Sequence, residues 1–463
     1  MTAAECTVFF LPGLGLDAAA AQPLAHELGD RFRVVPVTLP GQGGSADAPD
    51  GSVSAQIDTA LAVIADEADG GPWLLCAHSM GGKIAAGIAS RVRDGDMPVF
   101  GLLGVVLLAP SPPTPEPMPD EKRSQMLAWV EDGRIAEADA QTFVDDNVGA
   151  PLSAELQQPT VASVQAMSPV AWRRWLEQGS LEDTTSSVGV LDLPCTVLAG
   201  DQDDALGAAV QPDLLSGVYP RARFVSLAGA GHLLPLERPA EVAHAITELW
   251  DEILVHSAVV PAEWGRVIAS PRTTTRVRSA LARRALPDDA AYRSRVLEPE
   301  QLDLLRQIAA RLVPQPVGGV IDLAARVDTD LAAGGGDGWR PMGALTDDEA
   351  YRVGLDELLP AWPTSPDDQD AMIRDVIDGK GVPGGTVAGD ELRRWFEDLR
   401  VDLVREWLIH PASLARVGYD GFATGAEDVD FAGYQQLAAD TRDEWEPSDL
   451  GVAPLDQTQK DTA

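Results

Sequence analysis

The sequence predicts an α/β fold in its first 255 residues and a mainly α-helical domain in its last third. Short apolar runs of strand length alternate with helical patterns over residues 1–255, and no clear strand follows residue 297. Continuous apolar runs are typical of buried parallel strands, and their alternation with helices indicates a mostly parallel sheet with helices on both faces. A chain of 463 residues is also long enough for two or three domains.

Six apolar runs carry the strand prediction. The expected strands are Cys6–Leu11, Arg33–Val37, Trp73–Ala77, Phe100–Ala109, Pro194–Ala199 and Ala222–Leu227. The first helices are expected at Ala18–Leu28, Val53–Ala68 and Lys83–Val92. Residues 111–192 interrupt the alternation with helical patches alone, and we interpret them as a helical lid over the carboxyl edge of the sheet. The alternative is a helical excursion that only packs against the domain.

Charge and cysteine content restrict the class of protein. The net charge of −37 argues against nucleic acid and anionic membrane surfaces as partners. No apolar run reaches the roughly 18 to 20 residues of a membrane-spanning helix, and the amino terminus lacks a basic segment. Cys6, Cys76 and Cys195 lie far apart in apolar runs, which favours buried free thiols over a disulfide. We therefore expect a cytoplasmic protein without a membrane span.

The third expected strand leads into a serine flanked by small residues. Ser79 lies in Ala77-His78-Ser79-Met80-Gly81-Gly82, between that strand and a helix. A serine at such a sharp turn is held above the sheet edge, where it can act as a nucleophile. The N–H of Met80 and the helix that begins there would then face a developing oxyanion. Ala77 replaces the first glycine of the G-x-S-x-G pattern, a change between small residues.

Two later loops supply a base and an acid for this serine. Gly200-Asp201-Gln202-Asp203-Asp204 follows one expected strand and offers several carboxylates, and His232 follows the next strand in a glycine-rich turn. The order Ser79, Asp203, His232 is that of a Ser-Asp-His triad on this type of sheet. Taken singly, Ser79 could be a turn residue, His232 a core histidine and Asp203 a helix cap.

Residues 5–255 resemble the α/β-hydrolase superfamily, in its compact esterase, thioesterase and lactonase-like branch. The segments that carry the resemblance are Phe10–Gly15, Thr38–Ser45, Ala77–Gly82 and Gly229–Pro235. The resemblance implies that Leu14 supplies a second oxyanion N–H and that the acid is Asp203, with Asp201 and Asp204 as neighbouring candidates. Many relatives have a histidine before the glycine where this chain has Leu11-Pro12-Gly13, which removes a common supporting side chain.

A substrate pocket is expected beside the nucleophile and under the lid. Its candidate residues are His78, Met126, Trp129, Met167 and Trp172, which favour an apolar or aromatic acyl group. No Cys/His cluster has zinc spacing, and no glycine-rich loop matches a phosphate or dinucleotide fingerprint. We therefore expect neither a metal nor a cofactor.

After residue 255 the sequence changes character. An arginine-rich stretch, 256–296, is predicted to link the two domains as a solvated helix, or to dock an acidic partner or the chain's own acidic faces. Residues 297–440 follow as a helical domain, and residues 441–463 as an acidic and polar tail. The domain helices are expected at Gln301–Leu312, Ile321–Leu331, Tyr351–Leu359, Asp367–Ile377 and Glu391–Leu408.

Residues 297–435 resemble the family of the third, small subunit of gluconate 2-dehydrogenase. The motifs that carry the resemblance are Leu297–Gln301, Ala309–Pro314, Gly338-Trp339-Arg340, Tyr351 with Gly354-Leu355, His410-Pro411 and Gly418–Gly421. Members of that family accompany a large flavoprotein dehydrogenase, so the resemblance implies a flavoprotein as a possible partner. Many members are exported with a twin-arginine signal, which this chain lacks.

The favoured hypothesis is a serine hydrolase that acts on a small ester, thioester or lactone, with a helical domain that docks a flavin-dependent dehydrogenase. A flavoenzyme would then make a lactone or ester for this chain to open. The alternative from another class is a non-catalytic scaffold or accessory subunit of an oxidoreductase complex. A third hypothesis keeps the triad for perhydrolysis or C–C bond hydrolysis.

Overall fold

The computed structural model describes residues 4–45, 52–316, 319–334, 345–423, 425, 433–438 and 441–448. Internal contacts divide the chain into two compact units. Unit 1 comprises Met1–Ile253, Val259–Leu286 and Gly418–Ala463, and unit 2 comprises Leu254–Ala258 and Pro287–Val417. The motif Gly338-Trp339-Arg340 lies outside the described residues, as does most of the expected tail.

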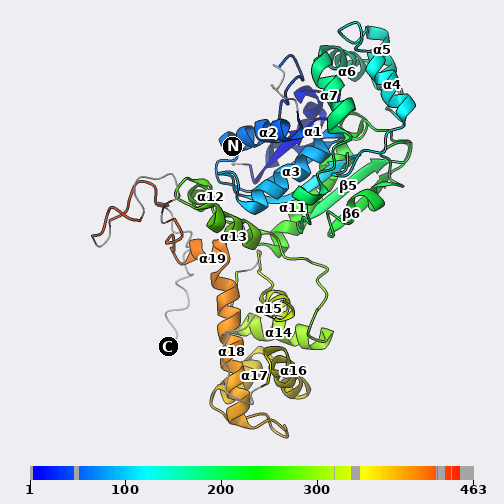
Figure 1. The fold of residues 1–463 in the computed structure, drawn as a ribbon. Coiled ribbons are helices and arrows are strands. Elements are labelled where there is room, and N and C mark those ends of the chain that lie inside the picture. The colour runs from blue at the N-terminus through cyan, green and yellow to red at the C-terminus, as the bar shows by residue number, and fades with distance from the viewer. Residues whose placement is uncertain are drawn as a thin grey trace. The chain divides into compact units, whose positions relative to one another are not determined.

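Unit 1 contains a six-stranded parallel sheet in the order β2-β1-β3-β4-β5-β6 (Figure 1). The strands are β1 (Cys6–Leu11), β2 (Phe32–Pro36), β3 (Trp73–His78), β4 (Leu102–Leu108), β5 (Cys195–Gly200) and β6 (Ala222–Leu227). Each coincides with an expected apolar run to within two residues at either end, and β3, β4 and β5 are buried throughout. The predicted α/β fold is confirmed.

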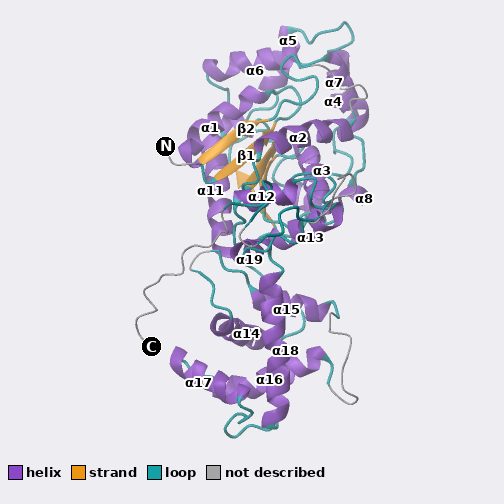
Figure 2. Cartoon of the chain, turned by 90° about the vertical axis from the view of Figure 1, so that its left-hand side faces the viewer, coloured by secondary structure: helices purple, strands orange, loops and turns teal. Residues whose placement is uncertain are grey.

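Helices cover both faces of this sheet. They are α1 (Gln22–Leu28), α2 (Val53–Glu67), α3 (Met80–Asp94), α9 (Gln211–Leu215), α10 (Leu234–Glu237) and α11 (Pro239–His256). Figure 2 shows β1 and β2 between α1 and α11 on one side and α2 and α3 on the other. Because Gly104 in β4 has no side chain, Leu249 and Ile253 of α11 pack closely against the strand. A Cβ added to Gly104 would lie only 3.2–3.3 Å from their side chains.

The segment inserted between β4 and β5 is helical, as the lid interpretation expects. It contains α4 (Asp120–Ala128), α5 (Glu137–Asp145), α6 (Ala154–Ala166), α7 (Pro169–Arg174), a π-helical turn (Trp175–Gly179) and α8 (Thr185–Val188). We keep the name lid segment for residues 111–192. Since β4 and β5 are neighbouring parallel strands, the lid segment leaves the sheet at its carboxyl edge, where the expected site residues also lie.

The expected linker at residues 256–296 contains two helices, α12 (Ala262–Ala269) and α13 (Thr275–Ala285), and both belong to unit 1. Arg278 of α13 is buried and donates hydrogen bonds to four backbone carbonyls, those of Gly95, Ile268, Ser270 and Thr273. Arg283 pairs with Asp94 at the end of α3. Arg278 and Arg283 therefore hold α13 against α3, while Arg266, Arg276 and Arg284 of the same stretch are exposed.

Unit 2 is a small helical domain. Its helices are α14 (Pro299–Leu312), α15 (Leu323–Ala332), α16 (Asp347–Leu358), α17 (Pro366–Ile377), α18 (Gly389–Leu408) and α19 (Pro411–Arg416). Five of them begin or end within four residues of the expected bounds. The helices α15, α16 and α17 pack against α18 around a core that includes Leu305, Leu355 and Leu399.

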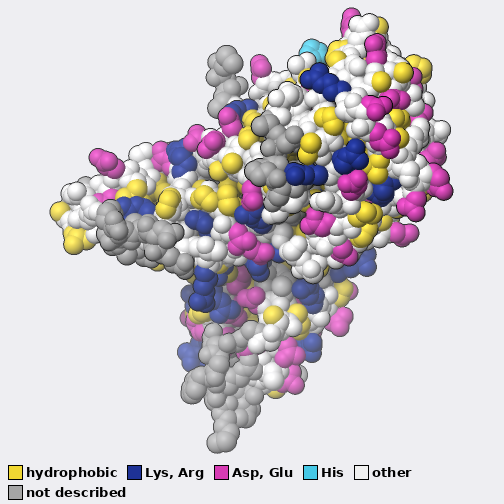
Figure 3. All heavy atoms as spheres, turned by 45° about the horizontal axis from the view of Figure 1, so that its top comes forward, with side chains coloured by type: hydrophobic (Ala, Val, Ile, Leu, Met, Phe, Trp, Pro, Cys, Tyr) yellow, Lys and Arg dark blue, Asp and Glu magenta, His cyan; other side chains and the backbone are white. Residues whose placement is uncertain are grey.

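Charged side chains of both signs lie on the surface. On the face in Figure 3, Asp and Glu side chains are spread among Lys and Arg side chains and form no single acidic patch. Cys6, Cys76 and Cys195 are buried and unpaired, as expected. Among the described helices, none is long and apolar enough to cross a membrane.

Candidate active site

Ser79 lies at a strained turn between β3 and α3. Its backbone has φ 50° and ψ −119°, a conformation that a residue with a side chain adopts at a cost of about 1–3 kcal/mol. Hydrogen bonds fix the turn: Ser79 N–H donates to Leu108 O at 3.0 Å, and Ser79 O accepts from Gly82 and Ser111 N–H at 2.8 and 2.9 Å. The strand and helix thus hold the serine at the carboxyl edge of the sheet.

The loop after β1 lies against this turn. A Cβ on Gly13 would come within 2.9 Å of Ser79 Cβ and 2.7 Å of His78 Nδ1, so only glycine fits there. Gln42 is buried and donates from Nε2 to Gly13 O at 3.1 Å. Because the N–H and C=O of a trans peptide point in opposite directions, this bond fixes the direction of the Leu14 N–H.

Two backbone N–H groups are available beside Ser79. Among the described residues, none accepts a hydrogen bond from the Leu14 N–H. Met80 is the first residue of α3, so its N–H has no acceptor within the helix. Both residues are buried at the edge where Ser79 lies. Two buried backbone N–H groups are therefore left without an acceptor among the described residues.

His232 and Asp203 form a close pair after β6 and β5. His232 Nδ1 lies 2.6 Å from Asp203 Oδ2, while Asp203 Oδ1 accepts from the N–H groups of Ala205 and Leu206 at 3.0 Å. Burial alone would raise the pKa of Asp203, but His232 and the backbone donors outweigh it and lower the pKa well below its usual range. Asp203 is therefore a carboxylate that orients the His232 ring.

The neighbouring carboxylates do not share this contact. Asp201 accepts from the N–H of Gly229 at 2.8 Å and from Gln202 Nε2, and Asp204 is exposed. The His232 loop is fixed separately, since His232 N–H donates to Asn147 O at 2.8 Å and Gly231 N–H donates to Glu237. Of the three aspartates that the sequence left open, Asp203 is the one whose carboxylate contacts His232 in the described structure.

His78, the residue before Ser79, is buried against His232. Burial and the nearby His232 lower the pKa of His78 to about 3, so its ring is neutral. His78 Nε2 lies 2.9 Å from His232 O, and because a carbonyl can only accept, Nε2 carries the proton. The His78 and His232 rings are 4.9 Å apart. His78, expected in the substrate pocket, therefore contacts the histidine loop directly.

The other expected pocket residues lie in the lid segment. Met167 is buried, and its Sδ accepts from Gly15 N–H at 3.2 Å, one residue beyond Leu14. Trp129 and Trp172 pack around Phe143, with ring centroids 5.4–6.5 Å apart. Trp172 Nε1 donates to Met126 O at 2.8 Å. The sequence analysis did not single out Phe143, although a Cβ on Gly15 would touch its ring at 3.1 Å.

Two further polar side chains lie next to the serine turn. Ser111 donates its backbone N–H to Ser79 O and its hydroxyl to Glu116 Oε2 at 2.6 Å, and both side chains are buried. Glu116 lies in the run Pro112-Pro113-Thr114-Pro115-Glu116-Pro117, whose prolines predict a loop. No local sequence pattern predicts that Glu116 lies near Ser79, and only the fold shows this.

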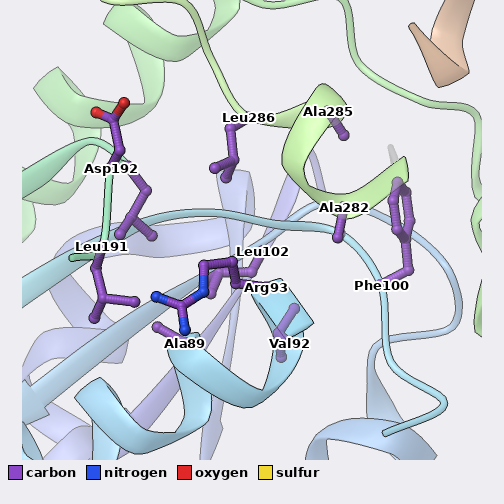
Figure 4. A pocket seen from close by; sticks show the side chains of 12 residues that line it. Ala89, Val92, Arg93, Phe100, Leu102, Leu191, Asp192, Ala282, Ala285 and Leu286 are labelled. Atoms are coloured by element: carbon purple, nitrogen blue, oxygen red, sulfur yellow. The ribbon is translucent and has the colours of Figure 1, made fainter. Parts of the chain in front are cut away.

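A hollow in unit 1 lies apart from this site. It lies at the opposite end of the sheet, near the start of β4, and is lined mainly by apolar side chains of α3, β4 and α13 (Figure 4). Arg93 at its wall donates to Val188 O and Val190 O. None of the expected site residues lines it. Within the described part of the chain, no group of three or more His, Cys, Asp or Glu side chains could hold a metal ion.

Comparison with known proteins places the chain in a family. Residues 8–245, just over half of the chain, match the profile of the alpha/beta hydrolase family. The chain therefore belongs to the alpha/beta hydrolase family, and it is a hydrolase. No curated protein matches it.

Three of the solved structures similar to the chain each cover about half of it. An esterase from Thermogutta terrifontis is 24% identical with a TM-score of 0.44, and covers 54% of this chain and 91% of its own. An enol-lactonase from Burkholderia xenovorans LB400 is 18% identical with a TM-score of 0.45, covering 54% and 92%. An esterase from Exiguobacterium antarcticum is 13% identical with a TM-score of 0.46, covering 53% and 92%.

Proposed function

We propose that the chain is a serine hydrolase that cleaves an ester, thioester or lactone through Ser79, His232 and Asp203. The observation that carries the proposal is the 2.6 Å contact between His232 Nδ1 and Asp203 Oδ2, at the same sheet edge as the strained Ser79 turn. A buried carboxylate on one imidazole nitrogen leaves the other nitrogen free to accept a serine proton. Strain at a non-glycine residue also persists where a function requires it.

The proposed reaction has two halves. Ser79 Oγ attacks the carbonyl carbon of the substrate while His232 Nε2 takes the hydroxyl proton, and Asp203 stabilises the resulting imidazolium. The N–H groups of Leu14 and Met80 stabilise the tetrahedral oxyanion. When the intermediate collapses, the imidazolium gives its proton to the departing alcohol or thiol. Water then attacks the acyl-serine with His232 again as base, which releases the acid and restores Ser79.

Fluorophosphonate labelling tests this proposal directly, because such probes react with activated serines. We expect the wild-type chain to be labelled at Ser79, as located by mass spectrometry, and Ser79→Ala and His232→Ala to remain unlabelled. Ser216→Ala, which removes an exposed serine of the same unit, should label like wild type. Hydrolysis of p-nitrophenyl esters and of lactones then identifies the substrate class. A folded wild-type protein without labelling would instead favour the non-catalytic scaffold.

For unit 2 we propose a docking role toward a flavin-dependent dehydrogenase. Support comes from the resemblance of residues 297–435 to the small gluconate 2-dehydrogenase subunit, and from three apolar side chains exposed along α18. Val401, Val404 and Leu408 are 55%, 43% and 38% exposed and have helical spacing. Copurification of a flavoprotein with the wild type, lost in Val401→Asp/Val404→Asp, would support the proposal. Equal recovery with both chains, or no flavoprotein with either, would contradict it.

A further inference from the structure

We propose that Glu116 is a specificity residue that selects substrates carrying a hydrogen-bond donor, a hydroxyl or a protonated amine, in addition to the scissile carbonyl. The inference rests on the proposed hydrolase function and deepens it. It makes the site more than an apolar acyl pocket, because one of its buried groups is an acceptor that the triad does not use.

The position of Glu116 follows from the end of β4. The chain leaves β4 through Ala109, whose φ is 41°, and Ser111 then donates its N–H to Ser79 O at 2.9 Å. The Ser111 hydroxyl reaches Glu116 Oε2 at 2.6 Å. Only one side chain therefore separates the Glu116 carboxyl from the backbone of the proposed nucleophile. His232 is also close enough to act electrostatically on this carboxyl.

The Glu116 carboxyl is short of donors. The Ser111 hydroxyl is its one hydrogen-bond donor among the described residues, and it leaves Oε1 without a donor there. No Arg or Lys of the described chain pairs with it. Glu116 is 9% exposed, so water or a ligand can still touch it. In the free chain water can occupy this acceptor, and a substrate donor would take the place of that water.

The two cations nearest to Glu116 are engaged elsewhere. Lys83 of α3 is fully buried, and its Nζ donates to the carbonyls of Gly179 and Glu182 at 3.0 and 2.6 Å. Burial lowers the pKa of Lys83 to about 8. Arg123 donates to Leu176 O and to Ser180 Oγ. Lys83 thus ties the lid segment to α3, Arg123 ties two parts of the lid segment together, and neither donates a hydrogen bond to Glu116 among the described residues.

Charge favours the same class of substrate. Burial raises the pKa of Glu116, while Ser111, His232, Lys83 and Arg123 oppose that effect. A protonated amine placed against the carboxyl would favour its ionised form, and a hydroxyl could donate to either form. An acyl chain that ends in a methyl group leaves the acceptor unsatisfied. A substrate that carries its own carboxylate would be repelled.

The test compares three series of p-nitrophenyl esters, whose straight acyl chains of matched lengths end in a methyl, a hydroxyl or an ammonium group. At the best length, we expect the wild type to favour the hydroxyl or ammonium ester over the methyl ester by about tenfold or more in kcat/KM. Glu116→Gln keeps a polar side chain without charge, so it should lose the ammonium preference and keep that for hydroxyl. Glu116→Leu should lose both.

A matched control and an independent readout separate the possible failures. Glu121→Gln removes an exposed carboxylate of the same lid segment and should leave all preferences unchanged. Fluorophosphonate labelling of Ser79 should persist in both Glu116 variants, and thermal unfolding checks that they fold. Two results would overturn the role of Glu116 and leave the hydrolase function intact. One is a labelled wild type that does not prefer hydroxyl or ammonium esters at any chain length, and the other is Glu116 variants that hydrolyse all three series equally more slowly. Absence of labelling would overturn the hydrolase function itself.

Discussion

Each unit of the chain buries a carboxyl group, and the two groups have very different surroundings. Asp328 in unit 2 is fully buried, and it accepts hydrogen bonds from the N–H groups of Arg295, Val296 and Leu297 and from the Tyr292 hydroxyl, at 2.6–3.1 Å. Glu116 in unit 1 has the Ser111 hydroxyl alone. Burial of a carboxyl is therefore no sign of function by itself; the number of donors it meets distinguishes the two.

The comparison has a physical basis. Four donors compensate the lost hydration of Asp328 and make it a cap that ties the chain before α14 to α15. Near Ser79, Gln42 Oε1 and His78 Nδ1 are buried with no hydrogen bond in the described structure, as is Trp395 Nε1 in unit 2. Use by a ligand or a reaction is one reason why such groups persist in folded proteins.

Asp203→Asn should have the largest effect. An asparagine amide facing His232 Nδ1 forces the proton onto Nε2, which then cannot accept the Ser79 proton. We expect kcat to fall about 10⁴-fold while the free energy of unfolding changes little. The measurement is ester hydrolysis together with thermal unfolding. Asp201→Asn is the matched control and should stay near wild type; a loss of less than about tenfold for Asp203→Asn would assign the acid to another carboxyl.

Asp328→Ala should act on stability alone. It removes the acceptor of three backbone N–H groups and one hydroxyl, so unit 2 should lose about 3 kcal/mol or more of its free energy of unfolding. Hydrogen exchange of peptides from α14 and α15 measures the loss. Labelling of Ser79 should remain as in wild type, because the residue belongs to the other unit. A drop in labelling would show that the two units are coupled.

Gln42→Leu tests the orientation of the oxyanion donors. Without the bond from Gln42 Nε2, Gly13 O keeps only the N–H of Leu16 as a donor among the described residues, so the peptide that carries the Leu14 N–H is held less firmly. We expect kcat to fall about tenfold or more, with a smaller change in KM. Ser45→Ala removes a hydrogen bond to Leu39 O within the same loop and serves as the control. Equal effects of both substitutions would mean that only the loop as a whole matters.

Features that depend on local sequence patterns could be predicted, and features that depend on contacts between distant residues could not. The six strands and most helices followed from apolar runs and helical spacing, because burial of apolar side chains determines both. Ser79, His232 and Asp203 could be proposed because each follows a strand in the expected order. Gln42 and Glu116 could not be, since their roles depend on contacts with Gly13 and Ser111 that no local pattern encodes.

The segment 256–296 shows the same limit. Its arginines favoured a solvated linker, yet Arg278 is buried among the carbonyls of four residues, including Gly95, far away in the sequence. An arginine that caps carbonyls cannot be distinguished from a solvated one by composition, because both occur in polar stretches. Only the packing of α13 against α3 decides between them.

A third buried carboxyl, Glu406 of α18, offers the finest test of the comparison. Burial and the nearby Asp330, with which it shares a hydrogen bond, raise the pKa of Glu406 to about 7, against the opposing effects of Arg326 and Arg405. The folded chain therefore binds a proton that the unfolded chain, with a value near 4.5, releases. This group's stabilising contribution is complete below about pH 4.5 and is lost as the pH rises toward about 7.

Glu406→Gln replaces the protonated carboxyl by a neutral amide of the same size at every pH. We expect hydrogen exchange of α15 and α18, corrected for the intrinsic rates, to show a flatter dependence of stability between about pH 4.5 and about pH 7. At about pH 8 the variant should be more stable than wild type by on the order of 1 kcal/mol. Asp375→Asn, which changes an exposed carboxylate paired with Lys380, should keep the wild-type slope. If Glu406→Gln keeps that slope too, Glu406 is ionised in the fold, and its donors satisfy it as fully as those of Asp328.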